Sequence, residues 1–135
     1  MSRAFAVTQV IDRPVDQVWR VLTDWDRAAE WMPGIDAVHV DGDTLRFRAR
    51  GRERTSAITG VRPGESVTLT SVQGAVRADY TYTIAEADAG TRATLVADLT
   101  VRSFWRVAAP VLRVAVRRAD GRQLDALKRL VETGR

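Results

Sequence analysis

SFWRVAAPVLRVAVRRADGRQLDALKRLVET, which spans residues 103–133, has the periodicity of one long helix. At 3.6 residues per turn one face of this helix is mainly apolar, with a glutamine among its members: Trp105, Ala109, Leu112, Val116, Ala119, Gln123, Leu127 and Leu130. Thirty residues of helix are about 45 Å long, the width of a small domain. We expect this helix to cover the apolar face of the elements before it.

Most of the chain before this helix has the alternation of β-strands. Leu45, Phe47 and Ala49 alternate with Arg46 and Arg48, which is the pattern of a sheet with one buried and one solvated face. Turn sequences rich in glycine, proline and aspartate separate such segments. The predicted strands cover residues 3–11, 35–40, 45–49, 55–61, 67–72, 76–85 and 91–102.

Two short helices are expected between the first two strands. Pro14 suits the first position of a helix, where no amide donor is needed, and apolar residues follow it at the spacing of one packed face: Val15, Val18, Trp19 and Leu22. Asp24 has the side chain of an N-cap for a second helix that runs through Trp31. A proline–glycine pair at 33–34 ends it.

These elements together predict a fold. Strands joined by tight turns form an antiparallel meander, and a sheet of several twisted strands curls. The sequence therefore predicts a single α+β domain over residues 1–135: a curved seven-stranded antiparallel sheet around a long C-terminal helix, with two short helices after the first strand. Such an arrangement can leave a cavity between sheet and helix.

Composition excludes several classes of protein. The chain has no cysteine, so disulfide-stapled folds and thiolate metal sites are excluded, and its single histidine, His39, is not enough for a metal site. Residues 1–11 lack the apolar core of a signal peptide, and no run of about 18 apolar residues is present. We expect a cytoplasmic protein with no metal and no cofactor.

The net charge of +4 raises the question of an anionic partner. Alternate arginines at positions 46, 48, 50, 52 and 54 form a predicted ladder on one strand face, which is suited either to solvent or to phosphates. Sheets that bind nucleic acid interleave exposed aromatic residues with such cations, and Phe47 lies on the opposite face. We therefore expect a solvated outer surface and no nucleic-acid partner.

Three segments carry a resemblance to a known family. They are IDRPVDQVW followed by Leu22-Thr23-Asp24 after the first strand, EWMPGI at residues 30–35, and Leu124, Leu127-Lys128 and Glu132 near the end. With the order of the elements, they resemble the helix-grip fold of the START-like (SRPBCC) superfamily. The local pattern is similar to its polyketide cyclase/dehydrase branch. The resemblance implies a hydrophobic ligand held between the sheet and the C-terminal helix.

The residues suggest which side chains would meet such a ligand. Tyr80 and Tyr82 share the predicted buried face of their strand, where a phenol gives an apolar wall one polar group, although both can equally be core. Trp31 and Met32 either plug one rim of the expected cavity or line its entrance. The expected ligand-binding residues are Trp31, Met32, Phe47, Tyr80, Tyr82, Trp105, Leu112 and Val116.

The expected function is binding of a hydrophobic small molecule, either a polyketide, a lipid or another aromatic compound. The alternative is a polyketide cyclase, aromatase or dehydratase that acts on such a ligand, with catalysis resting mainly on holding a flexible chain in one conformation. Asp79 and Asp98 are expected to face water by strand parity; if either pointed inward, it would be a candidate general base.

Residues 104–116 are apolar nearly all round the expected helix, and Val111 and Val114 lie away from the face of Leu112. Pro110 interrupts the segment. Four interpretations remain open: a kinked lid over the ligand, a homodimer surface, a transient membrane contact, or a helix that begins only at Pro110.

Overall fold

Seven antiparallel strands form one sheet in the order β1-β7-β6-β5-β4-β3-β2. The computed structural model describes residues 2–32, 35–49, 51–73, 76–88, 90–101 and 123–133. In chain order its elements are β1 (Ser2–Ile11), α1 (Val15–Leu22), the 3₁₀ helix η1 (Trp25–Glu30), β2 (Ile35–Asp41), β3 (Thr44–Ala49), β4 (Arg52–Arg62), β5 (Ser66–Gln73), β6 (Val76–Ala87), β7 (Gly90–Val101) and α3 (Gln123–Glu132). The predicted α+β fold with an antiparallel meander is confirmed.

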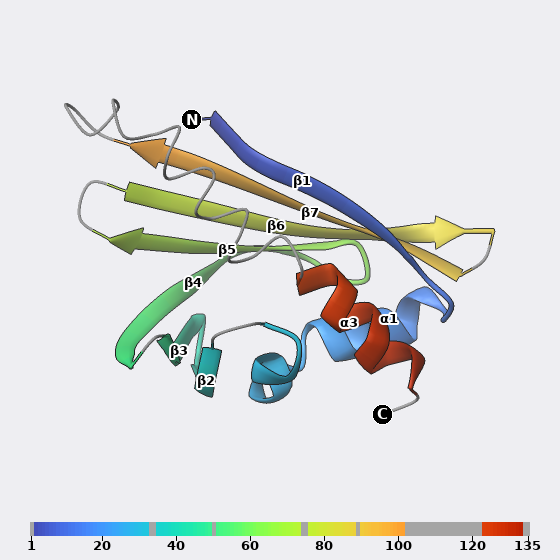
Figure 1. The fold of residues 1–135 in the computed structure, drawn as a ribbon, viewed down its shortest axis with the longest axis horizontal. Helices are drawn as coiled ribbons and strands as arrows, with labels where there is room; N and C mark the ends of the chain where they lie inside the picture. Colours follow the sequence, from blue (N-terminus) through green and yellow to red (C-terminus); the bar gives the residue numbers. More distant parts are fainter. Residues whose placement is uncertain are drawn as a thin grey trace.

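The sheet curls (Figure 1). β4 bends away from the long strands β1, β7, β6 and β5, and brings β3 and β2 to the side on which α1 and α3 lie. The pairing follows this bend, because β4 pairs with β5 from Ala57 to Arg62, whereas its residues from Arg52 to Ala57 pair with β3. The side of the sheet that faces α1 and α3 is termed the inner face below, and the opposite side is termed the outer face.

A buried apolar core fills the space between the inner face and the helices. Strands contribute Ile11, Val67, Tyr82, Ile84 and Leu95; α1 contributes Val18 and Leu22; α3 contributes Leu124, Leu127 and Val131. Full burial of one such side chain is worth about 1.5–3 kcal/mol. This packing holds the two helices, which have 8 and 10 residues, because isolated helices of that length are marginal in water.

Polar contacts fix α3 against β1 and the turn that follows it. The carboxylate of Glu132 accepts a hydrogen bond from the backbone amide of Asp12 at 2.8 Å. The side-chain amide of Gln9 donates to the carboxylate of Asp125, and the guanidinium of Arg13 donates to the carbonyl of Glu132. The last helix is therefore held at both its first and last turns.

Gly90 lets β7 begin directly against the end of β1. Its φ is +136°, and a β-carbon at this position would lie 2.3 Å from the carbonyl oxygen of Ile11. The next residue, Thr91, donates its hydroxyl to the carbonyl of Arg13 at 2.7 Å. A side chain at position 90 would therefore separate two segments that pack through backbone contacts, and only glycine fits there.

The predicted C-terminal helix is confirmed over the part that the structure describes. Gln123 and Leu127, both on the predicted face, are buried. Leu124 and Val131, which the predicted face leaves out, are buried as well, because α3 contacts α1 and η1 in addition to β1 and β7. Positions 103–122 lie outside the described residues, and with them Trp105, Leu112, Val116 and the proposed lid around Pro110.

The second short helix is a 3₁₀ helix, and Asp24 stands at its predicted N-cap position. Asp24 occupies the position before η1, but its side chain makes no capping hydrogen bond. The backbone provides the bonds instead, since the carbonyl of Asp24 accepts from the amide of Arg27 at 3.0 Å and that of Ala28 accepts from Trp31 at 3.1 Å. In α1, Pro14 stands at the N-cap, one residue before the predicted position.

Candidate functional site

Three of the predicted ligand-binding side chains lie on the inner face. Tyr82 is paired in register with Leu95, and Tyr80 with Ala97, both of which are fully buried. Tyr82 is itself buried, whereas Tyr80 and Phe47 are half-buried and pack against the core. The parity predicted for these strands is confirmed. Contact with a ligand depends in addition on what surrounds each side chain.

Trp31 and Met32 follow η1 and lie in the core, with 1% and 5% of their surface exposed. The Trp31 ring meets Tyr82 edge to face, with 5.6 Å between ring centroids, and the Tyr82 hydroxyl donates to Oε1 of Gln123 at 2.5 Å. These contacts join η1, β6 and α3. The indole nitrogen of Trp31 is buried without a hydrogen-bond partner among the described residues, so an unsatisfied donor lies within this junction.

A set of half-buried residues lies on the inner face next to this junction. It is termed the inner strip and consists of Phe47, Arg54, Ile58, Ser71, Ala78 and Tyr80, which come from β3, β4, β5 and β6. Phe47, Ile58 and Tyr80 pack on the buried core and still keep exposed surface. Such partial burial is expected of a wall that faces a ligand, because ligand sites are lined mainly by apolar and aromatic side chains with a few polar groups.

The polar groups of this wall include two serines and one arginine. Ser56, which is buried, and Ser71 join β4 to β5 through a hydroxyl–hydroxyl hydrogen bond of 2.5 Å. Arg54 precedes Ser56 by two residues on the same strand and therefore lies on the same face. None of these three residues was expected from the sequence to meet a ligand.

Arg54 corrects the predicted arginine ladder. β3 ends at Ala49 and β4 begins at Arg52, so the chain reverses around Gly51, where φ is +76°. Cross-strand partners share a face, and the partners are Ala49 with Arg52 and Phe47 with Arg54. Arg52 and Arg54 therefore belong to the inner side, while Arg46 and Arg48 remain on the outer side. Position 50 lies outside the described residues.

The outer face contains the two aspartates that parity placed there, but one of them is not solvated. Asp79 is only 8% exposed. Its carboxylate accepts a hydrogen bond from Thr70 at 2.5 Å and forms an ion pair with Arg77 at 3.2 Å. Asp98 is half-buried and stands between Asp79 and Arg3 in the sheet register. Both carboxylates point away from the inner strip, which argues against a role as general base there.

His39 is exposed on β2, as predicted. Within the described ranges, histidine and carboxylate side chains form no cluster of three or more that could hold a metal ion. In the same part of the chain, no helix is long and apolar enough to cross a membrane.

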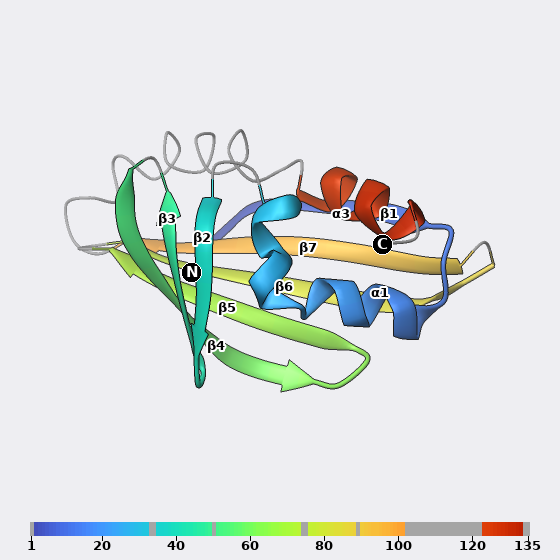
Figure 2. The same ribbon diagram turned by 90° about the horizontal axis from the view of Figure 1, so that it is seen from below.

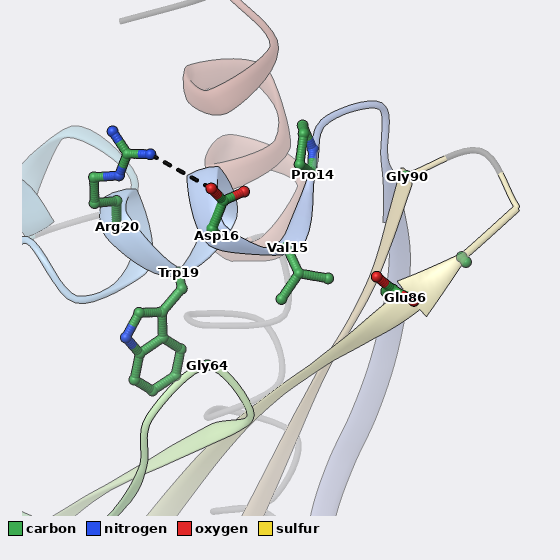
Figure 3. Close-up of a pocket in the computed structure, with 9 residues that line it drawn as sticks. Pro14, Val15, Asp16, Trp19, Arg20, Gly64, Glu86 and Gly90 are labelled. Atoms are coloured by element: carbon green, nitrogen blue, oxygen red, sulfur yellow. Dashed lines mark ion pairs between the residues drawn. The ribbon is translucent and has the colours of Figure 1, made fainter.

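A separate pocket of about 680 Å³ lies between the start of α1 and the turns after β4 and β6. Figure 3 shows Val15 and Trp19 pointing from α1 toward Gly64 and Glu86. Asp16 and Arg20, at its margin, form an exposed ion pair of 3.8 Å, a type of contact worth about 0–1 kcal/mol. This rim pocket offers one aromatic surface and the carboxylate of Glu86.

The rim pocket and the inner strip are different sites. None of the predicted ligand-binding residues within the described ranges lines the pocket. The pocket lies beside α1, whereas the β3–β4 hairpin with Phe47 and Arg54 lies toward the other end of the sheet (Figures 1 and 2). Sequence periodicity missed the pocket because it is formed where two turns approach one helix.

Comparisons with known proteins agree with this architecture. A START superfamily protein from Mycobacterium smegmatis superposes with a TM-score of 0.78 at 14% identity, covering 96% of this chain and 97% of that one. The Zhui aromatase/cyclase from Streptomyces sp. R1128 superposes with a TM-score of 0.74 at 19% identity, covering 95% and 92%. At these identities the likeness shows the fold alone.

No curated protein matches the chain in sequence. A family profile, in contrast, matches residues 2–132, which is nearly the whole chain, and its description is polyketide cyclase/dehydrase and lipid transport. The chain belongs to this family.

Proposed function

We propose that this protein binds a hydrophobic small molecule, either a polyketide, a lipid or another aromatic compound, between the inner face of its sheet and its C-terminal helix. The observation that carries the proposal is the inner strip. Phe47, Ile58 and Tyr80 are large side chains that pack on the core without being fully buried by it. A ligand placed on them would remove further apolar surface from water, at about 25 cal/mol for each Å².

Two polar features support the same site. The Trp31 indole N–H is buried without a partner among the described residues, and a ligand oxygen near it would satisfy a donor that otherwise costs about 1–3 kcal/mol. The Ser56–Ser71 pair and Tyr80 add hydroxyl groups to an otherwise apolar wall. We include Trp31, Met32, Phe47, Tyr80 and Tyr82 among the ligand-binding residues.

Binding of probes tests the proposal. Native mass spectrometry of freshly purified protein should detect a co-purified ligand, and an environment-sensitive dye, fatty acids and aromatic polyketides should bind with micromolar or lower Kd. Tyr80→Phe keeps the ring and removes one hydroxyl, so it should weaken binding of an oxygen-bearing ligand by about 0.5–1.5 kcal/mol. Thr83→Ala, an exposed change on the outer side of the same strand, is the matched control. A fully folded protein that binds none of these probes would refute the proposal.

The family description also names cyclases and dehydrases, so an enzyme is the second candidate. An enzyme would need a group positioned for proton transfer, which a carrier does not need. Incubation with a linear poly-β-ketone, followed by mass spectrometry of the extracted ligand, separates the two. Loss of water from the ligand at a rate above that of buffer supports catalysis, and recovery of an unchanged ligand supports binding alone.

A further inference from the structure

The β3–β4 hairpin places an arginine on the inner face of the sheet, among half-buried apolar side chains. Arg54 is the cross-strand partner of Phe47 and lies two residues before the buried Ser56. Along a strand, two residues are separated by about 6.6 Å. Along the inner side of β4 the chain therefore passes from the charged Arg54, through the hydroxyl pair of Ser56 with Ser71, to Ile58, which packs on the apolar core.

Arg54 combines partial burial with the absence of an ion pair among the described residues. Three of these are half-buried: Arg13, Arg27 and Arg54. Arg27 pairs with Glu30 at 2.7 Å and Arg13 lies 4.0 Å from Asp12. Arg54 has no carboxylate within ion-pairing distance among the described residues, since none of the ion pairs found there includes it.

A half-buried cation that has no ion pair among the residues the structure describes suits an external anion. The guanidinium presents its N–H donors in a planar fork that matches the two oxygens of a carboxylate. β4 bends away from β5 before Ala57 (Figure 1), so among the described strands Arg54 pairs only with β3. A ligand lying on Phe47, Ile58 and Tyr80 would bring its polar end to this position.

We propose that Arg54 recognises the carboxylate of the bound molecule, so that the preferred ligand is an apolar chain or ring system that ends in a carboxylic acid. This inference rests on the proposed function and specifies its ligand class. A fatty acid and an aromatic acid share this chemistry. In either case the apolar body lies on the inner strip, and the acid group lies at the β3–β4 hairpin.

Matched ligands test the inference. Binding of palmitic acid is compared with that of hexadecanol, and binding of 2-naphthoic acid with that of its methyl ester, near pH 7 and by displacement of a fluorescent dye. We expect each acid to bind about tenfold more tightly than its neutral partner, a factor equivalent to about 1.4 kcal/mol. A preference for only one of the two acids would identify whether a chain or a ring system fills the site.

Variants assign the preference to one side chain. Arg54→Gln should remove the preference for the acid, so that palmitic acid and hexadecanol bind with similar affinity. Arg54→Lys should keep part of the preference, because the charge remains and the fork is lost. Arg48→Gln, on the outer side of the same hairpin and opposite Glu53, should behave as the wild type. Thermal unfolding verifies the fold of each variant, and the lysine variant serves if the glutamine variant does not fold.

The failures of the two proposals are distinguishable. Equal binding of acid and neutral partner by the wild type, or an unchanged preference in Arg54→Gln, would overturn the role of Arg54 and leave hydrophobic binding standing. Failure of every probe to bind would overturn the proposed function and, with it, this inference.

Discussion

Glu132 links the last turn of α3 to the segment between β1 and α1. Its carboxylate accepts from the amide of Asp12 at 2.8 Å and from the ammonium of Lys128 at 2.5 Å. The backbone hydrogen bond from Asp12, followed by the bond from Lys128, holds the pKa of Glu132 below its usual range. A carboxyl group with a lowered pKa in the folded state stabilises that state above its unfolded pKa, and the contribution disappears as pH falls through the folded value.

We therefore expect Glu132→Gln to lower the free energy of unfolding at pH 7, and we expect the difference from the wild type to shrink below the ordinary glutamate pKa of about 4.3. Urea unfolding of both proteins between about pH 7 and pH 3 measures this difference. Glu65→Gln, in the exposed turn after β4, is the control. A difference that stays constant across this pH range would show that the carboxylate charge does not stabilise the contact.

At the scale of elements, α3 meets the sheet through a buried hydrogen bond to β6 as well as through apolar packing. The Tyr82 hydroxyl donates to Gln123, and these residues are 2% and 3% exposed. Tyr82 therefore joins β6 to the start of the helix, and removal of its hydroxyl should mainly lower the free energy of unfolding. This separates it from Tyr80, whose half-buried ring belongs to the inner strip.

We expect Tyr82→Phe to cost about 1 kcal/mol of unfolding free energy. Combined with Gln123→Met, the two costs should be less than additive, because each single change already breaks the same bond. Chemical denaturation of the two single variants and the double variant measures the coupling. Strict additivity would mean that the bond does not contribute to stability. A loss of dye binding without a loss of stability would show that the Tyr82 hydroxyl acts in ligand binding alone.

The strands also show where sequence reasoning succeeds. Alternation predicted the inner face of β6 and β7 correctly, because a strand buried on one side repeats every two residues. It failed at Arg54, because alternation continued across Gly51 ignores the reversal of the chain there. A glycine between two arginine-rich segments was the available signal. The rim pocket and the Tyr82–Gln123 bond, which joins residues 41 positions apart, depend on tertiary contacts that no local pattern contains.

At the scale of the whole molecule, one curved sheet serves two purposes. Toward α1 and α3 its inner face is fully packed, as Leu95 and Leu127 illustrate with no exposed surface. On β3 to β6 the same face carries the inner strip, whose large side chains keep exposed area. The family architecture was predictable from element order and three short segments, whereas this division was not, because it depends on tertiary contacts between the sheet and the described helices.

This division predicts that stability and binding can be changed separately. Leu95→Ala removes a fully buried side chain and should cost about 2–5 kcal/mol of unfolding free energy. Phe47→Ala should cost under about 2 kcal/mol, because only part of its ring is buried, and it should weaken binding of a hydrophobic dye about fivefold, which corresponds to about 1 kcal/mol. Denaturation and dye titration of both variants give the two readouts. If Phe47→Ala destabilises the protein as much as Leu95→Ala and leaves dye binding intact, the inner strip is ordinary core and the ligand must bind elsewhere on the molecule.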